Sequence, residues 1–273
     1  MCIRDRKKVH SHYDQLDDPI LYGKGKRIKQ ILEVNNNIAW SVKTTLEDGK
    51  MPLVIAGDHS SSIGSVTGLR MALPESKIGV IWIDAHADIH SPYTSPSGNL
   101  HGMPIAALLG EDNMQEAVNS PKEEAQKYWN QVKNLGVSAP KIASNDIYYI
   151  GLRDTEEQED KLIAQEKIPV ELVGDVRNHG IADTVERAMK HLSHCDHIHL
   201  SFDVDSLDPS VSDGTGTPVP GGFSLEEGCE LVQQFMVTGK ISSFELVEVN
   251  PLLDTQNKMA KAALAVLKST GLI

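Results

Sequence analysis

Six short apolar runs, separated by longer and more polar stretches, constrain the fold of this chain more than any other feature. The runs are rich in β-branched residues and apolar on both faces, a pattern typical of parallel strands that are covered on both sides. We therefore expect strands at residues 51–56, 77–83, 146–152, 168–173, 197–202 and 242–247.

Helical patterns fill several of the intervals between these runs. Ser224 and Glu227 form a capping box before an apolar stripe, and Gly239 is placed to end that helix. A second stripe runs through residues 182–192, and a closing helix covers residues 259–267. Repeated strand-then-helix order predicts right-handed crossovers and an α/β fold. This is a doubly wound, mostly parallel sheet with helices on both faces, whose ligands bind beyond the carboxyl ends of the strands.

Residues 111–145 are charged and weakly patterned, and we expect a surface helical excursion there.

Length and charge narrow the class of protein. A chain of 273 residues with 40% hydrophobic content can form one core, so we expect a single domain over residues 1–273. The formal net charge of −12 argues against a nucleic-acid partner, which requires a basic face. No apolar run approaches the roughly 20 residues that span a bilayer. Cys2, Cys195 and Cys229 have no zinc or redox spacing, which predicts reduced thiols in a cytoplasmic protein.

Three polar segments, 57–60, 84–88 and 201–205, follow three of the apolar runs and carry the chemistry. Strand ends of a parallel sheet meet at one edge, and Asp203 and Asp205 would share a strand face through the two-residue period. Mixed imidazole and carboxylate ligands favour a hard or borderline divalent ion such as Mn²⁺. Four aspartates would balance two divalent ions, which together activate a water molecule for hydrolysis. The predicted ligands are His59, Asp84, His86, Asp88, Asp203 and Asp205.

These segments, read as Gly-Asp-His-Ser, Asp-Ala-His-Ala-Asp and Ser-Phe-Asp-Val-Asp-Ser-Leu-Asp-Pro, resemble the signature blocks of the arginase (ureohydrolase) family. The resemblance extends from about residue 51 to the C-terminus. It implies two Mn²⁺ ions per subunit and hydrolysis of a guanidinium group by a metal-bridging hydroxide. By position, Asp84 and Asp203 would bridge the two ions, with His59 and Asp88 at one and His86 and Asp205 at the other.

The same resemblance implies two catalytic residues. His101 would transfer a proton beside the site, since an imidazole with an ordinary pKa near ~6.5 changes charge near neutral pH. Glu248 would hold the guanidinium over the hydroxide, which matters because a delocalised cation is a poor electrophile.

The substrate implied by the resemblance is L-arginine, with L-ornithine and urea as products. Residues 97–104 resemble the arginase loop in which a serine and an asparagine, here Ser97 and Asn99, bind the α-carboxylate. Residues 153–159 resemble the acidic segment that holds the α-ammonium group. The remaining implied substrate contacts are His90, Asp154, Glu156, Glu159 and Thr217.

Three departures from the family pattern keep alternatives open. His90 stands where the family usually has a carboxylate-contacting asparagine, and Glu156 replaces a usual aspartate. The family's opening strand, which lies inside the sheet, is not recognisable before residue 51, nor are its glycine-rich turn and helix. We expect residues 1–37 to be truncated or non-native. The alternatives are another ureohydrolase, acting on agmatine or a guanidino acid, and a non-catalytic truncated fragment. The family resemblance also suggests a homotrimer or homohexamer.

Several other residues of types that can bind metals or act in catalysis are expected to have structural roles. Asp58 should cap the turn after it or orient His59, Glu245 should be a buried strand-end carboxylate, and Asp208 should serve a turn. The histidine series at positions 191, 194, 197 and 199 is not expected to bind a metal as a group.

Overall fold

The computed structural model describes residues 6–15 and 17–273, so residues 1–5, including Cys2, and Leu16 lie outside it. Within the described residues, six strands form one parallel sheet in the order β1-β6-β5-β2-β3-β4. All six predicted strands are present. They are β1 (Leu53–Ile55), β2 (Ile78–Ile83), β3 (Ile147–Ile150), β4 (Val170–Glu171), β5 (His197–Asp203) and β6 (Ile241–Val247).

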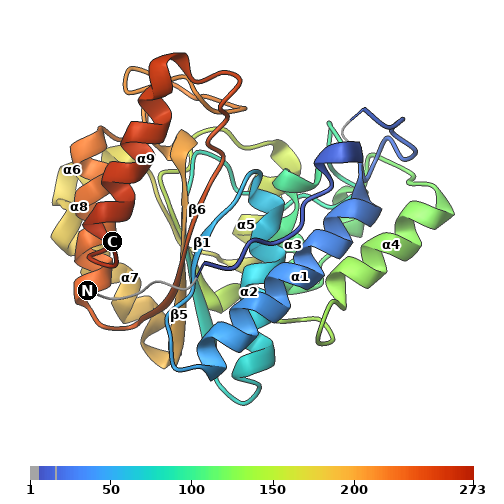
Figure 1. The fold of residues 1–273 in the computed structure, drawn as a ribbon, viewed down its shortest axis with the longest axis horizontal. Helices are drawn as coiled ribbons and strands as arrows, with labels where there is room; N and C mark the ends of the chain where they lie inside the picture. The colour runs from blue at the N-terminus through green and yellow to red at the C-terminus, as the bar shows by residue number, and fades with distance from the viewer. Residues whose placement is uncertain (1–5, 16) are drawn as a thin grey trace.

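Helices cover both faces of this sheet, as the alternating pattern predicts (Figure 1). One core layer lies between the sheet and α6 (Val173–His179), α7 (Ile181–His191), α8 (Leu225–Val237) and α9 (Lys258–Ser269). The other lies beneath α1 (Ile28–Glu47), α2 (Ser62–Ala72), α3 (Pro104–Leu109), α4 (Glu123–Lys133) and α5 (Glu157–Glu166). β2 and β5 are buried along almost their whole length, so the polar side chains that alternate along β5, namely His199, Ser201 and Asp203, lie inside the protein.

The region before residue 51 contains a helix that the sequence pattern did not predict. Helix α1 spans 20 residues and packs closely on α2, where a Cβ atom at Gly64 or Gly68 would lie 2.6 Å from a backbone oxygen of α1. The prediction failed because Asn35 interrupts the apolar stripe of α1, although its side chain is buried. No strand precedes β1 within residues 6–15 and 17–52, which agrees with the expected lack of an opening strand.

The predicted surface excursion at residues 111–145 is only partly a surface segment. Its helix α4 buries Ala125, Trp129 and Val132 against the second core layer. The Trp129 indole donates a hydrogen bond to Asp112 at 2.7 Å, which satisfies its buried N–H. The apolar residues of α4 thus face the core, whereas Met114 and Val118 earlier in the segment are exposed.

Asn35 provides a test of the α1–α2 interface. Its Oδ1 accepts a hydrogen bond of 2.6 Å from the backbone N–H of Gly64, one of the first N–H groups of α2, which have no partner within their own helix. We expect Asn35→Ala to lower the free energy of unfolding by about 1 to 3 kcal/mol, because that buried donor loses its acceptor. Denaturant unfolding measures the loss. Asn36→Ala, at an exposed position of the same helix, is the control, and equal losses in both variants would contradict this role.

Candidate active site

The candidate active site lies where four neighbouring strands end. β1 leads to Asp58 and His59, β6 leads to Glu248, β5 ends at Asp203, and β2 leads to Asp84. These strands are adjacent in the order β1-β6-β5-β2, so segments far apart in sequence meet at one edge of the sheet.

One ring nitrogen of His59 faces three carboxylates. Its Nδ1 lies 2.9 Å from Asp84 Oδ2, 3.1 Å from Asp88 Oδ2 and 3.1 Å from Asp203 Oδ2. The four side chains are buried. Neither His59 Nδ1 nor Asp84 Oδ2 forms a hydrogen bond despite their proximity. Buried polar atoms without partners are costly, and a cation among these four groups would satisfy them.

A second group shares Asp84 with the first. His86 Nδ1 lies 3.4 Å from Asp84 Oδ1 and 3.1 Å from Asp205 Oδ2. Asp84 thus presents one oxygen to each group, the arrangement expected of a carboxylate that bridges two ions. Each group brings three or more nitrogen and oxygen donors within 4.8 Å of one another, so the donor set fits divalent metal ions.

The placement of Asp205 differs from the sequence prediction. Strand β5 ends at Asp203, and Asp205 belongs to a 3-10 turn, Val204–Ser206, so the two carboxylates do not share a strand face. The turn still brings them to one site, because Asp203 Oδ1 accepts a hydrogen bond of 2.8 Å from the backbone N–H of Asp205.

The electrostatics of the site indicate an excess of buried negative charge. Burial, together with the charges of Asp205 and Asp84, raises the pKa of Asp203 well above its usual range. Burial and the charge of Asp84 raise the pKa of Asp205 to about 6. Burial also lowers the pKa of His59, but Asp203, Asp84 and Asp88 outweigh it and raise that pKa well above 6.5. Without metal, bound protons thus neutralise part of the negative charge of the aspartates, and divalent ions would neutralise that charge when bound.

Residues outside the predicted set hold His59 in place. Its ring stacks on Trp82, with ring centroids 3.9 Å apart, and its Nε2 lies 2.7 Å from Ser201 Oγ. Ser201 and Trp82 are paired residues on adjacent strands, a relation that only the sheet register reveals. Contacts of this kind set the orientation of a ligand imidazole.

Glu245 anchors the turn that carries His59, as expected of a structural carboxylate. It is fully buried, and its two oxygens accept hydrogen bonds from Ser61 Oγ at 2.7 Å and Ser62 Oγ at 2.6 Å. Asp58 caps the same turn by accepting a hydrogen bond of 2.9 Å from the Ser60 backbone N–H.

His101 and Glu248 lie together beside the candidate metal ligands. His101 Nδ1 is 3.4 Å from Glu248 Oε1, which also accepts a hydrogen bond of 2.9 Å from the His59 backbone N–H. Burial lowers the pKa of His101, but Glu248 outweighs it and raises that pKa to about 9, above the ordinary value assumed from the sequence. Glu248 has a left-handed backbone with φ of 68°, as has Asp88 with φ of 51°. Such strain in non-glycine residues concentrates at functional sites.

The loop that carries Ser97 and Asn99 is held by the N-terminal part of the chain. The backbone N–H groups of Gly25 and Lys26 donate to Gly98 O at 3.1 and 2.8 Å, and Lys24 Nζ donates to Ser95 O at 3.0 Å. Gly98 has a φ of +74°, and a Cβ atom there would lie 2.0 Å from Gly23 O. Ser97 is exposed and Asn99 partly exposed, so both are accessible.

His90 and Glu156, the two residues that differ from the usual family pattern, contact each other. His90 Nε2 lies 3.0 Å from Glu156 Oε2, and His90 Nδ1 lies 3.0 Å from Thr94 Oγ1. Glu159 is buried and holds the start of α5, because its Oε2 accepts a hydrogen bond of 3.1 Å from the Glu156 backbone N–H. Asp154 is exposed, 3.5 Å from His86 Nε2.

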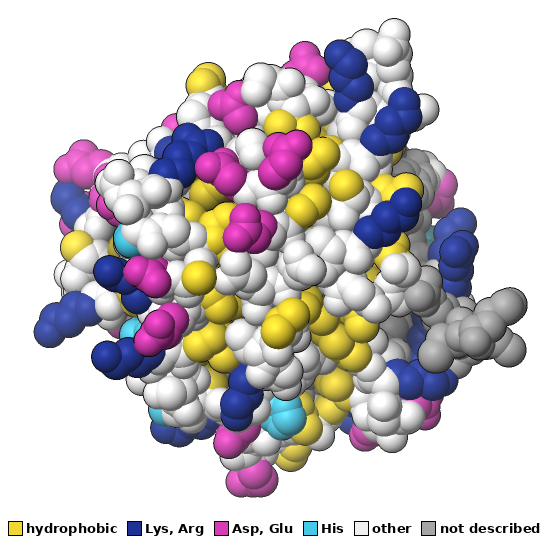
Figure 2. Space-filling model, turned by 90° about the vertical axis from the view of Figure 1, so that its left-hand side faces the viewer, with side chains coloured by type: hydrophobic (Ala, Val, Ile, Leu, Met, Phe, Trp, Pro, Cys, Tyr) yellow, Lys and Arg dark blue, Asp and Glu magenta, His cyan; other side chains and the backbone are white. Residues whose placement is uncertain are grey.

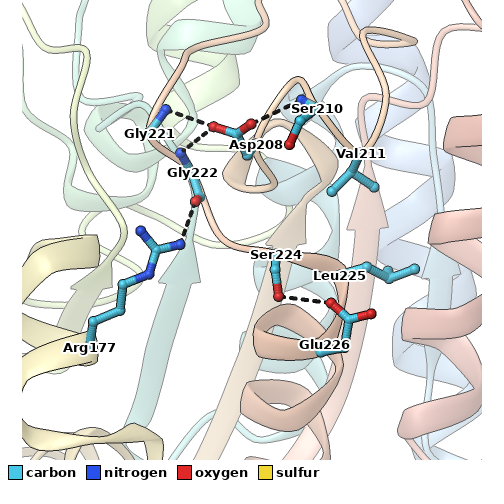
Figure 3. Close-up of a pocket in the computed structure, with 9 residues that line it drawn as sticks. All are labelled: Arg177, Asp208, Ser210, Val211, Gly221, Gly222, Ser224, Leu225 and Glu226. Carbon is cyan, nitrogen blue, oxygen red and sulfur yellow. Dashed lines mark hydrogen bonds between the residues drawn. The ribbon is translucent and has the colours of Figure 1, made fainter.

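The loop after Asp205 is tied down by side chains on both sides. Thr217 Oγ1 donates to Asp205 Oδ2 at 3.1 Å, so this residue contacts a candidate metal ligand. Arg153 Nη2 donates to the backbone oxygens of Asp205 and Val219, at 2.6 and 2.9 Å. Asp208 accepts hydrogen bonds from the backbone of Ser210, Gly221 and Gly222, which is the predicted turn role (Figure 3). The pocket of about 490 Å³ drawn there includes none of the candidate metal ligands.

The surface shows charges of both signs. The face formed by α6 to α9 carries acidic and basic side chains interspersed with apolar ones (Figure 2). No helix within the described residues is long and apolar enough to cross a membrane.

A buried carboxylate and imidazole centre at the carboxyl edge of a parallel sheet, with an acid–base pair beside it, is typical of metal-dependent α/β hydrolases. The Arginase family model matches residues 4–272. The chain belongs to the arginase family, whose members are metal-dependent hydrolases of carbon–nitrogen bonds in linear amidines. The match also covers the region before residue 51, where the sequence alone revealed no family feature.

Individual relatives agree with this assignment. The arginase of Bacillus subtilis (strain 168) is 38% identical over 244 residues, covering 89% of this chain and 76% of the relative. The arginase of Bacillus caldovelox is 35% identical over 275 residues, covering 96% and 86%. Among solved structures, Bacillus subtilis arginase has a TM-score of 0.80 at 37% identity, covering 92% of this chain and 81% of that one. Entamoeba histolytica arginase in complex with L-ornithine has a TM-score of 0.81 at 30% identity, covering 92% and 79%.

The Glu248–His101 pair predicts a change in the pKa of His101. We expect Glu248→Gln in the metal-free protein to lower that pKa from about 9 toward 6.5, because the neutral amide no longer stabilises the imidazolium. NMR titration of the imidazole measures the shift, with Asp154→Asn as a control that leaves it unchanged. Because the folded pKa is raised, the pair stabilises the fold fully below pH 6.5, and this contribution is lost as pH rises through about 9. An unchanged pKa in Glu248→Gln would exclude this pairing.

The close approach at Gly98 predicts an effect on substrate binding. We expect Gly98→Ala to displace the loop that carries Ser97 and Asn99 and to lower kcat/KM about tenfold or more, since a 1 Å misplacement can cost ~100-fold. Gly49→Ala is the matched control, because Gly49 has a similar φ of +69° but no atom within 4 Å of an added Cβ. Steady-state kinetics of both variants test this. Equal losses would assign the effect to backbone strain alone.

Proposed function

We propose that this protein hydrolyses the guanidinium group of L-arginine to L-ornithine and urea. The observation that carries the proposal is the position of Glu248 and His101 beside two groups of metal donors that share Asp84. The names and similarity of the relatives support the same reaction. The exposed Ser97 and Asn99 loop supports an amino-acid substrate, since hydroxyl and amide groups suit a carboxylate.

We further propose that the centre binds two Mn²⁺ ions. His59, Asp84, Asp88 and Asp203 would hold one, and Asp84, His86, Asp203 and Asp205 the other. When bound, the ions supply a water nucleophile of lowered pKa. Co²⁺, Fe²⁺ and Ni²⁺ accept similar ligands, so the choice of Mn²⁺ rests on the family resemblance.

The residues of the chain have distinct tasks in this proposal. Glu248, fixed by the His59 backbone and by its own strained conformation, would hold the guanidinium and orient its central carbon. His101, at 3.4 Å from Glu248, would deliver a proton to the departing amine, because its imidazolium lies beside the same carboxylate. Thr217 would position Asp205 through its hydrogen bond.

The α-ammonium end of the substrate would meet Asp154 and Glu156. Because Glu156 already contacts His90, part of its charge is directed away from the ammonium group, and this favours a guanidino acid without that amine as a second candidate substrate. Agmatine keeps the amine but lacks the α-carboxylate, and it is a second candidate because His90 stands where the family usually has a carboxylate-contacting asparagine. Homotrimeric or homohexameric assembly and a cytoplasmic location remain predictions from the sequence.

Comparing urea release from L-arginine and agmatine with added Mn²⁺ tests the substrate. We expect faster turnover of L-arginine, whereas faster turnover of agmatine would transfer the assignment to the second candidate. Asp205→Ala should lose one of two manganese ions by elemental analysis and most of the activity, while Asp183→Ala, at an exposed position of α7, should retain both. Retention of both ions in Asp205→Ala would overturn the ligand assignment.

A further inference from the structure

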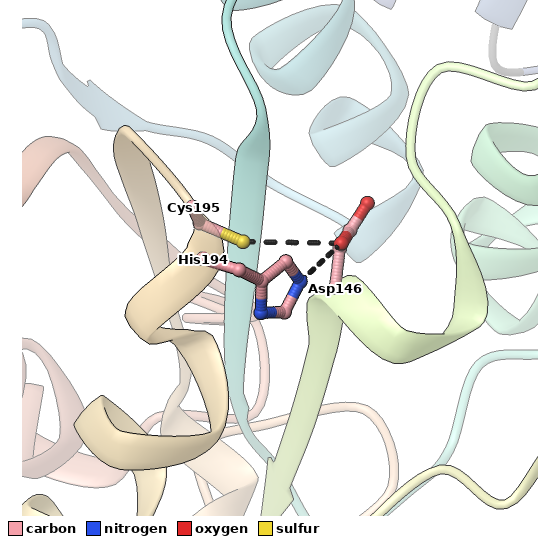
Figure 4. Close-up of side chains that lie close together, drawn as sticks. All are labelled: Asp146, His194 and Cys195. Atoms are coloured by element: carbon pink, nitrogen blue, oxygen red, sulfur yellow. Dashed lines mark hydrogen bonds and ion pairs between the residues drawn. The ribbon is translucent and has the colours of Figure 1, made fainter.

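A cluster of three different donor side chains lies at the opposite edge of the sheet from the candidate active site. Asp146 immediately precedes β3, and His194 and Cys195 precede β5, so the cluster joins the beginnings of the two strands that flank β2. Figure 4 shows the side chains of His194 and Cys195 directed toward the carboxylate of Asp146.

The donor atoms converge on one point. His194 Nε2 lies 2.8 Å from Asp146 Oδ1, and Cys195 Sγ lies 3.9 Å from the same oxygen. All three donor atoms lie within 4.8 Å of one another, the same convergence found in the two groups of the candidate active site. A zinc ion has ligand distances of ~2.3 Å to sulfur and ~2.0 Å to nitrogen, and donor atoms this close together can share one such ion.

The contacts of the His194 ring leave its Nε2 facing a carboxylate oxygen. Its Nδ1 lies 3.0 Å from the carbonyl oxygen of His191, which accepts only, so Nδ1 carries a proton. The lone pair of Nε2 is then directed at Asp146 Oδ1, so a metal ion between the two atoms would be bound by both. Ligand histidines commonly donate their other ring N–H to a backbone carbonyl in this way.

Neighbouring residues position Asp146 and leave space for Cys195. Asp146 Oδ2 accepts a hydrogen bond of 2.9 Å from the Ala143 backbone N–H, which sets the direction of Oδ1. Gly79 of β2 leaves room for the thiol, because a Cβ atom there would lie 3.1 Å from Cys195 Sγ. Cys195 and Asp146 are buried, whereas 31% of the His194 side chain is exposed and provides access from solvent.

We propose that Asp146, His194 and Cys195 form a separate binding site for a Zn²⁺-class divalent ion, with water as the fourth ligand. A thiolate and a carboxylate balance the charge of one divalent ion. The thiolate favours zinc over manganese. This distinguishes the site from the candidate active site, whose donors are only oxygen and nitrogen atoms.

Binding exchanges protons for the ion. The thiol proton of Cys195 leaves to solvent as the sulfur–metal bond forms. Because binding releases protons, the affinity for the ion should increase with pH. The bound ion would link β3 to β5 across β2 and raise the melting temperature of the native state.

Cobalt titration tests the site independently of catalysis. In protein first saturated with Mn²⁺, we expect Co²⁺ to produce a near-ultraviolet thiolate-to-cobalt absorption that saturates at one equivalent and disappears on adding Zn²⁺. Cys195→Ser should abolish this absorption, and Cys229→Ser, at a half-buried cysteine of α8, should retain it. His194→Ala should weaken binding about tenfold or more.

Any of three results would overturn the proposal. The unmodified chain could show no saturable absorption, the absorption could survive in Cys195→Ser, or the affinity could be unchanged in His194→Ala. If Cys195→Ser does not unfold cooperatively, His194→Ala and Asp146→Asn decide the question, and retained affinity in both would exclude the site. The result is separate from the urea assay, because either site can be present without the other.

Discussion

The contact of His59 Nδ1 with three buried carboxylates is the interaction on which the candidate active site depends. Taking three aspartates out of water is unfavourable unless a positive charge accompanies them. Protons can supply part of that charge, as the raised pKa values of Asp203 and Asp205 show, and divalent ions can supply it fully. The fold is therefore coupled to whatever cation enters the site, and metal binding and stability should change together.

Residues around His59 connect its position to the core of the protein. Trp82 and Ser201, on neighbouring strands, fix the ring of His59, while Glu245 on a third strand fixes the turn that begins with it. Glu248 connects the same turn to the acid–base pair through the His59 backbone. One imidazole thus connects the candidate metal donors, His101 and the core beneath them.

The two edges of the sheet show how similar chemistry can be placed at opposite ends of the same strands. At the carboxyl edge, oxygen and imidazole donors suit hard or borderline ions, while at the amino edge a thiol joins them. In both places a histidine nitrogen faces a carboxylate oxygen, an arrangement that a cation between the two groups would stabilise. The spacing of cysteines along the chain could not indicate the second site, because Asp146 is remote in sequence from His194 and Cys195 and meets them only through the strand order.

The amino-acid sequence by itself determined the α/β class and all six strands, and it indicated the candidate donor residues that the structure brings together, since apolar periodicity and strand-end motifs are local properties. It did not reveal α1, whose apolar stripe contains Asn35, because the polar side chain is satisfied only by an N–H group of another helix. It also placed Asp205 on a strand and assumed an ordinary pKa for His101. Only the tertiary structure decided that a 3-10 turn carries Asp205, that Glu248 raises the pKa of His101, and that residues 23–26 hold the loop of Ser97 and Asn99. Those properties arise from contacts between distant segments, and local pattern carries no information about which distant segments meet.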